Sequence, residues 1–323
     1  MYPLKFKPIL KTLVWGGEKI APYKGIETDQ HKIGESWELS GVKGGESVIA
    51  EGPLEGKTIA ELVKEYKGEL IGEHVYANTG DEFPLLVKFI DALQDLSIQV
   101  HPDDELAAAR HNGSKGKTEM WYVVDAGPGA HLLVGLKEKI TPEIYAEKVA
   151  DGTITDVLCR YDVKPGDVFF LPAGRIHAIC GGCFIAEIQQ TSDITYRIFD
   201  YNRPGLDGKP RQLHTELAKD AIDYTVYKDY RTHYTPVQDE EQEIVSCPYF
   251  TTSIYDLTLP YAKDLSGIDS FLVVMCLQGS GTLEVDGEEV SIGQGETVLI
   301  PASADDICFI PDDSLKILTS YIR

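Results

Sequence analysis

The sequence predicts a mainly β protein built from two β-barrels, with helices inserted into the first. Three observations indicate this fold class. A strand, a turn with glycine and proline at fixed offsets and a second strand occupy residues 166–177. The segments 97–101 and 117–124 alternate polar and apolar side chains with the period of a β-strand. A weaker copy of the first pattern, at 293–306, indicates the second barrel.

Four helices are expected between the strands of the first barrel, over residues 58–72, 102–113, 141–152 and 213–222. The first opens with the capping box Thr58-Ile-Ala-Glu61 and continues as an amphipathic pattern. The second has Asp103 or Asp104 as its N-cap and Gly113 as its terminator.

The strands are expected to bring polar side chains onto common faces. In Ser97-Ile-Gln-Val-His101, Gln99 and His101 share a face because side chains alternate with period two. In the segment 117–124, the same alternation places Lys117, Glu119 and Trp121 on one side. An amide, an imidazole and a carboxylate can therefore converge on one point.

The turn in 166–177 is expected to be a two-residue hairpin loop with Pro172 and Gly174 at its bends. It would join the apolar strand 167–171 directly to a strand that begins near His177. The imidazole of His177 would then be held at the start of a rigid strand.

Together these strands predict a metal site with four oxygen or nitrogen donors from Gln99, His101, Glu119 and His177. Such a set suits one borderline divalent cation per chain, zinc above all, while Mn, Fe, Co and Ni remain compatible with the ligand types. The donors carry only one negative charge, so a bound ion would stay net positive and act as a Lewis acid. Any one of these residues alone would suggest a structural role; their joint spacing favours the metal site.

On these motifs the chain resembles the type I mannose-6-phosphate isomerases of the short bacterial kind, metalloenzymes built on cupin (jelly-roll) barrels. Six segments carry the resemblance: Trp15-Gly-Gly17, Gly34-Glu-Ser-Trp-Glu-Leu-Ser40, Gln99-Val-His-Pro102, Lys117-Thr-Glu-Met-Trp121, Pro172-Ala-Gly-Arg-Ile-His177 and Glu187-Ile-Gln-Gln-Thr-Ser-Asp-Ile-Thr-Tyr-Arg197. The resemblance implies interconversion of mannose 6-phosphate and fructose 6-phosphate through an enediol.

The resemblance also implies catalytic roles for Arg197, Glu187 and Lys117. Because an arginine stays protonated at neutral pH, Arg197 would stabilise negative charge instead of acting as a base; its alternative is a surface salt bridge. Glu187 and Lys117 match positions assigned to acid-base or substrate-binding work, and the choice of base stays open.

The substrate phosphate needs local positive charge, because the chain carries a net charge of -22. Ser97 and Lys117 are the expected contacts, with Arg175 or Lys88 as further candidates.

The same net charge argues against nucleic acid or an anionic membrane as partner. We expect a cytoplasmic monomer or homodimer that acts on a small sugar phosphate, since the chain shows neither a signal-like apolar segment nor a membrane-length apolar run.

Two other functions stay open. Two histidines and a carboxylate could serve a non-haem metal oxygenase, although that chemistry has no need of Gln99 or of the Arg197 motif. The barrel could also be a non-enzymatic module that binds sugar, although the intact set of metal ligands argues against this.

The charged segment 238–243 marks the expected domain boundary. Residues 1–240 would form the catalytic metal-binding domain with its helical insertions, and 241–323 a degenerate cupin domain without metal. Asp306 stands where the first barrel has its ligand histidine, and no histidine follows His233. The second domain would therefore have a structural role, covering one side of the catalytic barrel or forming an interface.

Overall fold

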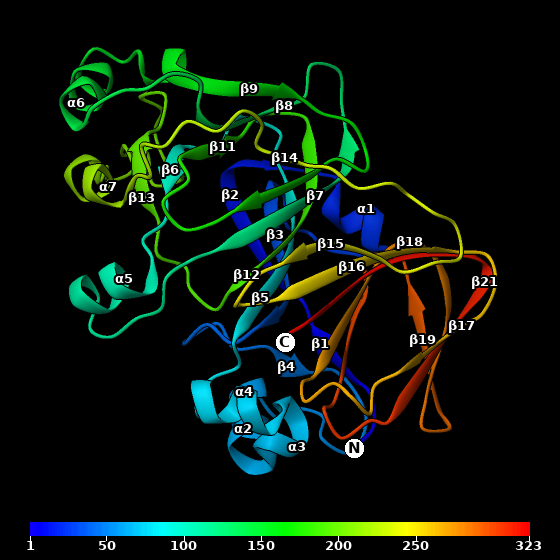
Figure 1. Ribbon diagram of the computed structural model, residues 1–323. Helices are drawn as coiled ribbons and strands as arrows, with labels where there is room; N and C mark the ends of the chain where they lie inside the picture. Colours follow the sequence, from blue (N-terminus) through cyan, green and yellow to red (C-terminus); the bar gives the residue numbers. More distant parts are fainter.

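A computed structural model describes residues 1–323. It contains three antiparallel β-sheets, with seven short α-helices around and between them (Figure 1). The prediction of a mainly β protein is confirmed. No helix combines the length and the apolar character needed to cross a membrane.

Two of the sheets are built from residues 9–232 and enclose one core. The seven-stranded sheet has the order β14, β10, β7, β12, β5, β3, β2, with β2 Ile9–Gly17, β3 Ile33–Ser40, β5 Leu85–Asp91, β7 Glu119–Ala126, β10 Val168–Leu171, β12 Cys183–Gln190 and β14 Arg231–Thr232. The five-stranded sheet has the order β13, β6, β11, β8, β9, with β6 Ile98–Val100, β8 His131–Leu136, β9 Leu158–Asp162, β11 His177–Ile179 and β13 Tyr196–Phe199. Side chains from both sheets, among them Trp121, Phe169 and Val134, form one buried cluster. Burial of such a cluster holds the two layers together.

The third sheet has nine strands. Its order is β15, β16, β21, β18, β20, β1, β4, with β17 paired to β21 and β19 to β18. The strands are β1 Leu4–Lys7, β4 Val48–Ile49, β15 Gln242–Ser246, β16 Thr251–Leu257, β17 Tyr261–Asp264, β18 Leu272–Val285, β19 Glu288–Gly293, β20 Thr297–Ile300 and β21 Asp306–Tyr321. Most of this sheet follows residue 240, but β1 pairs with β20 and with β4, so two strands come from the start of the chain. The division at residue 240 stays a prediction.

The helices are α1 Ile20–Lys24, α2 Ile59–Tyr66, α3 Gly68–Ile71, α4 Glu73–Thr79, α5 Asp104–Arg110, α6 Pro142–Ala150 and α7 Thr215–Ala221, with a 3₁₀ turn η1 Ile154–Val157. The capping box of Thr58 and Glu61 is present, and Asp103 is the N-cap of α5. The single helix expected over 58–72 is interrupted, because Lys67 takes a positive φ of 49° and separates α2 from α3.

The hairpin predicted at Pro172 and Gly174 is wrong. β10 hydrogen bonds to β7 and β14, whereas β11 pairs with β6 and β8, so this connection carries the chain from one sheet to the other. A hydrogen bond to another segment holds the turn: the backbone N–H of Gly174 donates to the carbonyl of His101, which follows β6, at 2.9 Å. Gly174 itself has a φ of 87°, which favours glycine. His177 still opens a strand, as expected.

The weak repeat in the C-terminal sheet has the predicted local structure. β20 ends at Ile300 and Asp306 opens β21, as β10 ends at Leu171 before His177 opens β11. The side chain of Asp306 is exposed, and its cross-strand neighbour is Asp264. An exposed pair of carboxylates lacks the imidazole donors of a transition-metal site.

Replacing Asp306 with alanine is therefore expected to leave the metal content per chain unchanged. Elemental analysis of the purified variant beside the parent protein checks this. Loss of an ion from a parent protein that holds two per chain would show that the second sheet also binds metal.

Candidate active site

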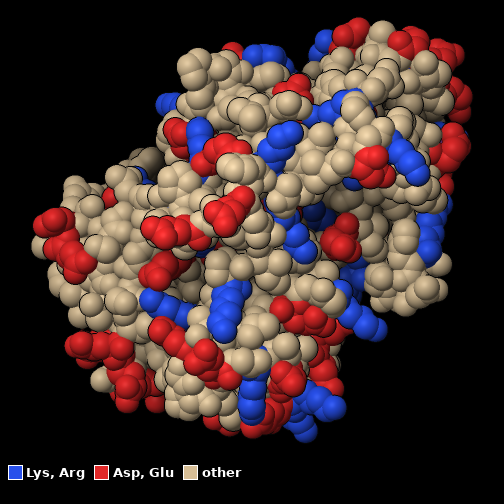
Figure 2. All heavy atoms as spheres, turned by 180° about the vertical axis from the view of Figure 1, so that it is seen from behind, with Lys and Arg blue, Asp and Glu red and all other residues tan.

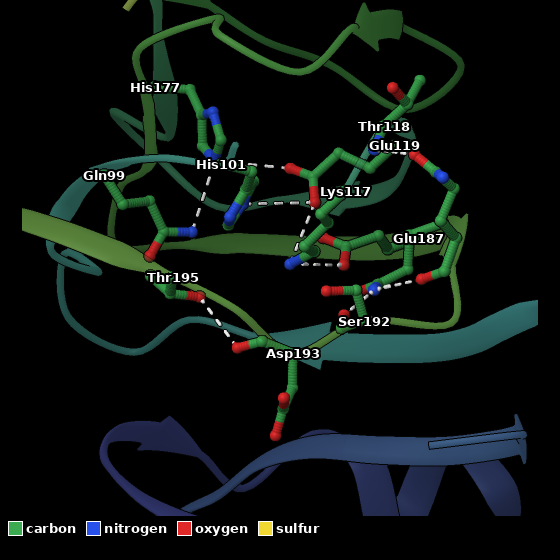
Figure 3. A network of polar contacts seen from close by, with 12 residues as sticks. Gln99, His101, Lys117, Thr118, Glu119, His177, Glu187, Ser192, Asp193 and Thr195 are labelled. Carbon is green, nitrogen blue, oxygen red and sulfur yellow. Dashed lines mark hydrogen bonds and ion pairs between the residues drawn. The ribbon is translucent and has the colours of Figure 1, made fainter. Parts of the chain in front are cut away.

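Three strand segments meet where the two N-terminal sheets face each other, and they bring His101, Glu119 and His177 together (Figure 3). His101 follows β6, Glu119 opens β7 and His177 opens β11. One possible ligand atom from each lies within 4.8 Å of the others, and all three side chains are buried. The sequence prediction of this convergence is correct for these three residues.

Both imidazoles are fixed in the tautomer that a metal requires. The Nδ1 of His101 lies 2.9 Å from the carbonyl oxygen of Ile194, and the Nδ1 of His177 lies 2.8 Å from that of Arg175. Since a carbonyl can only accept, each Nδ1 carries the proton and each Nε2 keeps its lone pair. Burial lowers the pKa of His177 to about 4 and that of His101 well below its ordinary value, so both rings are neutral at pH 7.

The carboxylate of Glu119 lies between the two rings. Its Oε1 is 3.3 Å from the Nε2 of His177 and its Oε2 is 3.5 Å from the Nε2 of His101. The Oε1 of Glu119 and the Nε2 of His101 are buried without a hydrogen-bond partner. Leaving such atoms unpaired costs about 1–3 kcal/mol each. A divalent cation at this point would satisfy both of them, so these residues fit a metal.

Gln99, the fourth predicted ligand, lies beside these three residues. It lies opposite His177 in the pairing of β6 with β11, and its Nε2 is 3.3 Å from the Nε2 of His177. Turning the amide by 180° would present Oε1 to the same point, and a cation would favour that orientation because only the oxygen can accept.

Charged side chains of alternating sign extend from the carboxylate of Glu119. The Nζ of Lys117 lies 3.1 Å from Oε2 of Glu119 and 3.8 Å from Oε1 of Glu187, while the Nζ of Lys88 lies 3.0 Å from the same Glu187 oxygen. Burial alone would raise the pKa of Glu187, but Lys88 and Lys117 lower it below its usual value. Burial and the charge of Glu187 raise the pKa of Glu119. Glu187 is thus the carboxylate that is held ionised.

A cavity of about 160 Å³ opens beside these residues. Its lining includes Ser97, Gln99, Lys117, Glu187 and Arg197, which were all predicted site residues. Four basic and three acidic side chains line it in total: Lys88, Lys117, Arg197, Arg211, Glu35, Glu187 and Asp193. On the molecular face in Figure 2, acidic and basic side chains are interspersed. The cavity lining thus has one more basic than acidic side chain, whereas the whole chain carries a net charge of -22.

Arg197 reaches this cavity from β13. It pairs with Gln99 across β13 and β6, so the two side chains share a face. Its Nη1 donates to the carbonyl of Gln212 at 3.0 Å, its Nε is buried without a partner, and it forms no ion pair. Burial and the nearby Arg211 lower its pKa. The alternative of a surface salt bridge is therefore wrong.

Lys88 and Arg175, the two further candidates for binding the substrate phosphate, lie in different places. Lys88 lines the cavity, whereas the guanidinium of Arg175 stacks over the rings of Tyr227 and Tyr230, at 4.6 and 4.7 Å from their centroids. Arg175 is therefore engaged outside the cavity lining.

Sequence reasoning missed several polar neighbours of the site. The indole Nε1 of Trp121 donates to Glu187 at 2.7 Å, and Glu35 lies 3.5 Å from the Nζ of Lys88. Arg211 lines the cavity from a loop and binds Asp200 at 2.6 Å. Alternation within 117–124 placed Trp121 on the correct face, but no local signal revealed Glu35 or Arg211.

Comparison with known proteins identifies the family. Residues 4–122 match the model described as phosphomannose isomerase type I, catalytic domain, and residues 240–310 match the model for the mannose-6-phosphate isomerase cupin domain. GmuF of Bacillus subtilis, named as a probable mannose-6-phosphate isomerase, is 36% identical over 305 residues, which are 93% of this chain and 94% of that protein. The chain belongs to the type I mannose-6-phosphate isomerase family. ManA of the same organism, named mannose-6-phosphate isomerase, is 35% identical over 303 residues, or 93% of each chain.

A solved structure agrees with this membership. The crystal structure of the mannose 6-phosphate isomerase from Bacillus subtilis superposes with a TM-score of 0.87 at 30% identity, covering 100% of both chains. The sequence-based resemblance to this isomerase family is confirmed, and the oxygenase alternative is not favoured.

Proposed function

We propose that the protein interconverts mannose 6-phosphate and fructose 6-phosphate with the help of one divalent metal ion, zinc being the first candidate. The observation that carries the proposal is the buried meeting of His101, Glu119 and His177 beside a cavity with local positive charge. Family membership supports the same reaction. Gln99 would be the fourth ligand.

The reaction moves a proton between neighbouring carbons and passes through an enediol. When bound, the metal ion would supply a Lewis acid next to the sugar oxygens. Glu187, held ionised by Lys88 and Lys117, can accept and return the proton, and Lys117 is the second acid-base candidate.

Arg197 would stabilise the negative charge that develops on the enediol oxygen. Its guanidinium has no carboxylate partner to neutralise it, and burial strengthens its interaction with an anion. Ser97 and Lys117 would bind the substrate, since both line the cavity and share it with Gln99.

The division of the chain into two cupin domains is part of the same proposal. Residues 1–240 would form a cupin barrel with helical insertions, and 241–323 a metal-free cupin unit. We keep the cytoplasm as the expected location.

A coupled assay tests the function directly. Protein loaded with Zn²⁺ and given mannose 6-phosphate is expected to produce fructose 6-phosphate, and treatment with a chelator is expected to abolish this turnover. A metal-loaded, folded protein that converts neither sugar phosphate into the other would rule the proposal out.

A further inference from the structure

Asp104, the first residue of α5, joins three segments that are distant in sequence. Its Oδ1 accepts hydrogen bonds from the backbone N–H of Gly116 at 2.7 Å and from the Nε2 of Gln190 at 3.0 Å. Its Oδ2 accepts the hydroxyl of Tyr249 at 2.8 Å. Tyr249 lies in the turn between β15 and β16, so it comes from the C-terminal sheet.

Two of these bonds lead directly to the active site. The Oε1 of Gln190 accepts the backbone N–H of Thr118 at 2.8 Å, and the backbone N–H of Gln190 donates to the carbonyl of Thr118 at 3.1 Å. Gly116 and Thr118 flank Lys117, which lies beside Glu119 in Figure 3. The backbone is thus fixed on both sides of Lys117 and next to Glu119.

The contact at Gly116 leaves little room for adjustment. A Cβ built there would lie 2.5 Å from the carbonyl carbon of Asp103 and 2.6 Å from the backbone nitrogen of Asp104. Only glycine allows the two backbones to approach so closely. The hydroxyl of Tyr249 keeps its proton at neutral pH and can donate it in this hydrogen bond, because burial and Asp104 raise its pKa to about 12.

We propose that Asp104 and Tyr249 are positioning residues, through which the C-terminal sheet holds Lys117 and Glu119 in place for metal binding and turnover. Neither residue lines the cavity. Their effect would pass through the backbone of 116–118, which leads directly to Glu119. The expected effect on turnover rests on the proposed isomerase reaction, whereas the effect on metal retention rests only on the proposed metal site.

Tyr249→Phe removes one hydroxyl and keeps the ring. We expect metal retention against a chelator to weaken about tenfold and kcat to fall by a similar factor, with KM within about twofold, the low end of effects seen for outer partners of metal sites. Asp104→Asn should be more severe, about tenfold to a hundredfold. The double variant should be no worse than Asp104→Asn alone, because both changes act in one chain of hydrogen bonds.

Tyr23→Phe is the matched control. The hydroxyl of Tyr23, in α1, donates to the carbonyl of Leu277 in β18 at 2.6 Å, so it also links the N-terminal part to the C-terminal sheet without reaching 116–119. This variant is expected to lower the melting temperature and to retain metal like the parent. Equal metal retention in Tyr249→Phe and Tyr23→Phe would overturn the proposal.

Failure of a variant to fold and absence of isomerase turnover can each be distinguished from failure of this proposal. If Asp104→Asn fails to fold, Tyr249→Phe alone decides the question. If the parent protein lacks isomerase turnover, the proposed function fails, whereas the chelator comparison still shows whether Tyr249 positions the metal ligands.

Discussion

Replacing His177 with alanine is expected to remove the metal and to reduce isomerase turnover to background. The Nε2 of His177 lies 3.3 Å from Oε1 of Glu119, and its ring is oriented by the carbonyl of Arg175. Alanine supplies no donor, so the remaining ligands would hold the ion weakly. Elemental analysis per chain and the coupled assay with mannose 6-phosphate measure the two effects.

His131→Ala is the control for that experiment. The Nδ1 of His131 lies 3.0 Å from the carbonyl of Gly129, two residues earlier, as the Nδ1 of His177 contacts the carbonyl of Arg175. His131 does not belong to the buried cluster of ligands, so its variant should keep the metal. Full metal occupancy in His177→Ala would refute the assignment of this ligand.

Replacing Arg197 with alanine is expected to lower kcat about a hundredfold to a thousandfold while metal content stays near that of the parent protein. A cation that acts on charge developing in the transition state contributes mainly to kcat, and removal of one such donor has this typical cost. Arg197 is suited to the role because it lines the cavity and forms no ion pair. Steady-state kinetics with mannose 6-phosphate give the value.

Arg160→Ala provides the comparison for loss of a surface charge. The Nη2 of Arg160 pairs with Asp162 at 2.9 Å, and its side chain is 54% exposed. Such surface pairs contribute about 1 kcal/mol or less to stability, and this one lies outside the cavity lining. Its variant should turn over normally. A rate within a few-fold of the parent in Arg197→Ala would exclude that arginine from the mechanism.

The convergence of His101, Glu119 and His177 was predictable because the signals for it are local in the sequence. Alternation with period two indicated the faces of Gln99, His101 and Glu119, and the spacing of Gly166 to His177 indicated that His177 stands at the start of a strand. Thr58 and Asp103 likewise marked the starts of α2 and α5 through caps that their own side chains complete.

Features that depend on tertiary partners were not predictable. The turn at Gly174 resembles a hairpin locally, but its N–H finds the carbonyl of His101, and this directs the chain into the other sheet. Glu35 reaches Lys88 only because β3 pairs with β5. No local pattern indicated the hydrogen bond between Asp104 and Tyr249, whose partners are 145 positions apart in the chain.

The placement of β1 has a consequence for synthesis and folding. Leu4 pairs with Leu299 and Lys5 with Val298, so β1, which also pairs with β4, meets this second partner only after all the intervening strands have been synthesised. Until then its backbone donors and acceptors form an open edge, which can recruit foreign strands. Contacts so distant in sequence also slow folding, because a long loop must close before they form. A fragment that stops near residue 240 would never cover this edge, and we expect it to aggregate instead of folding as an independent enzyme.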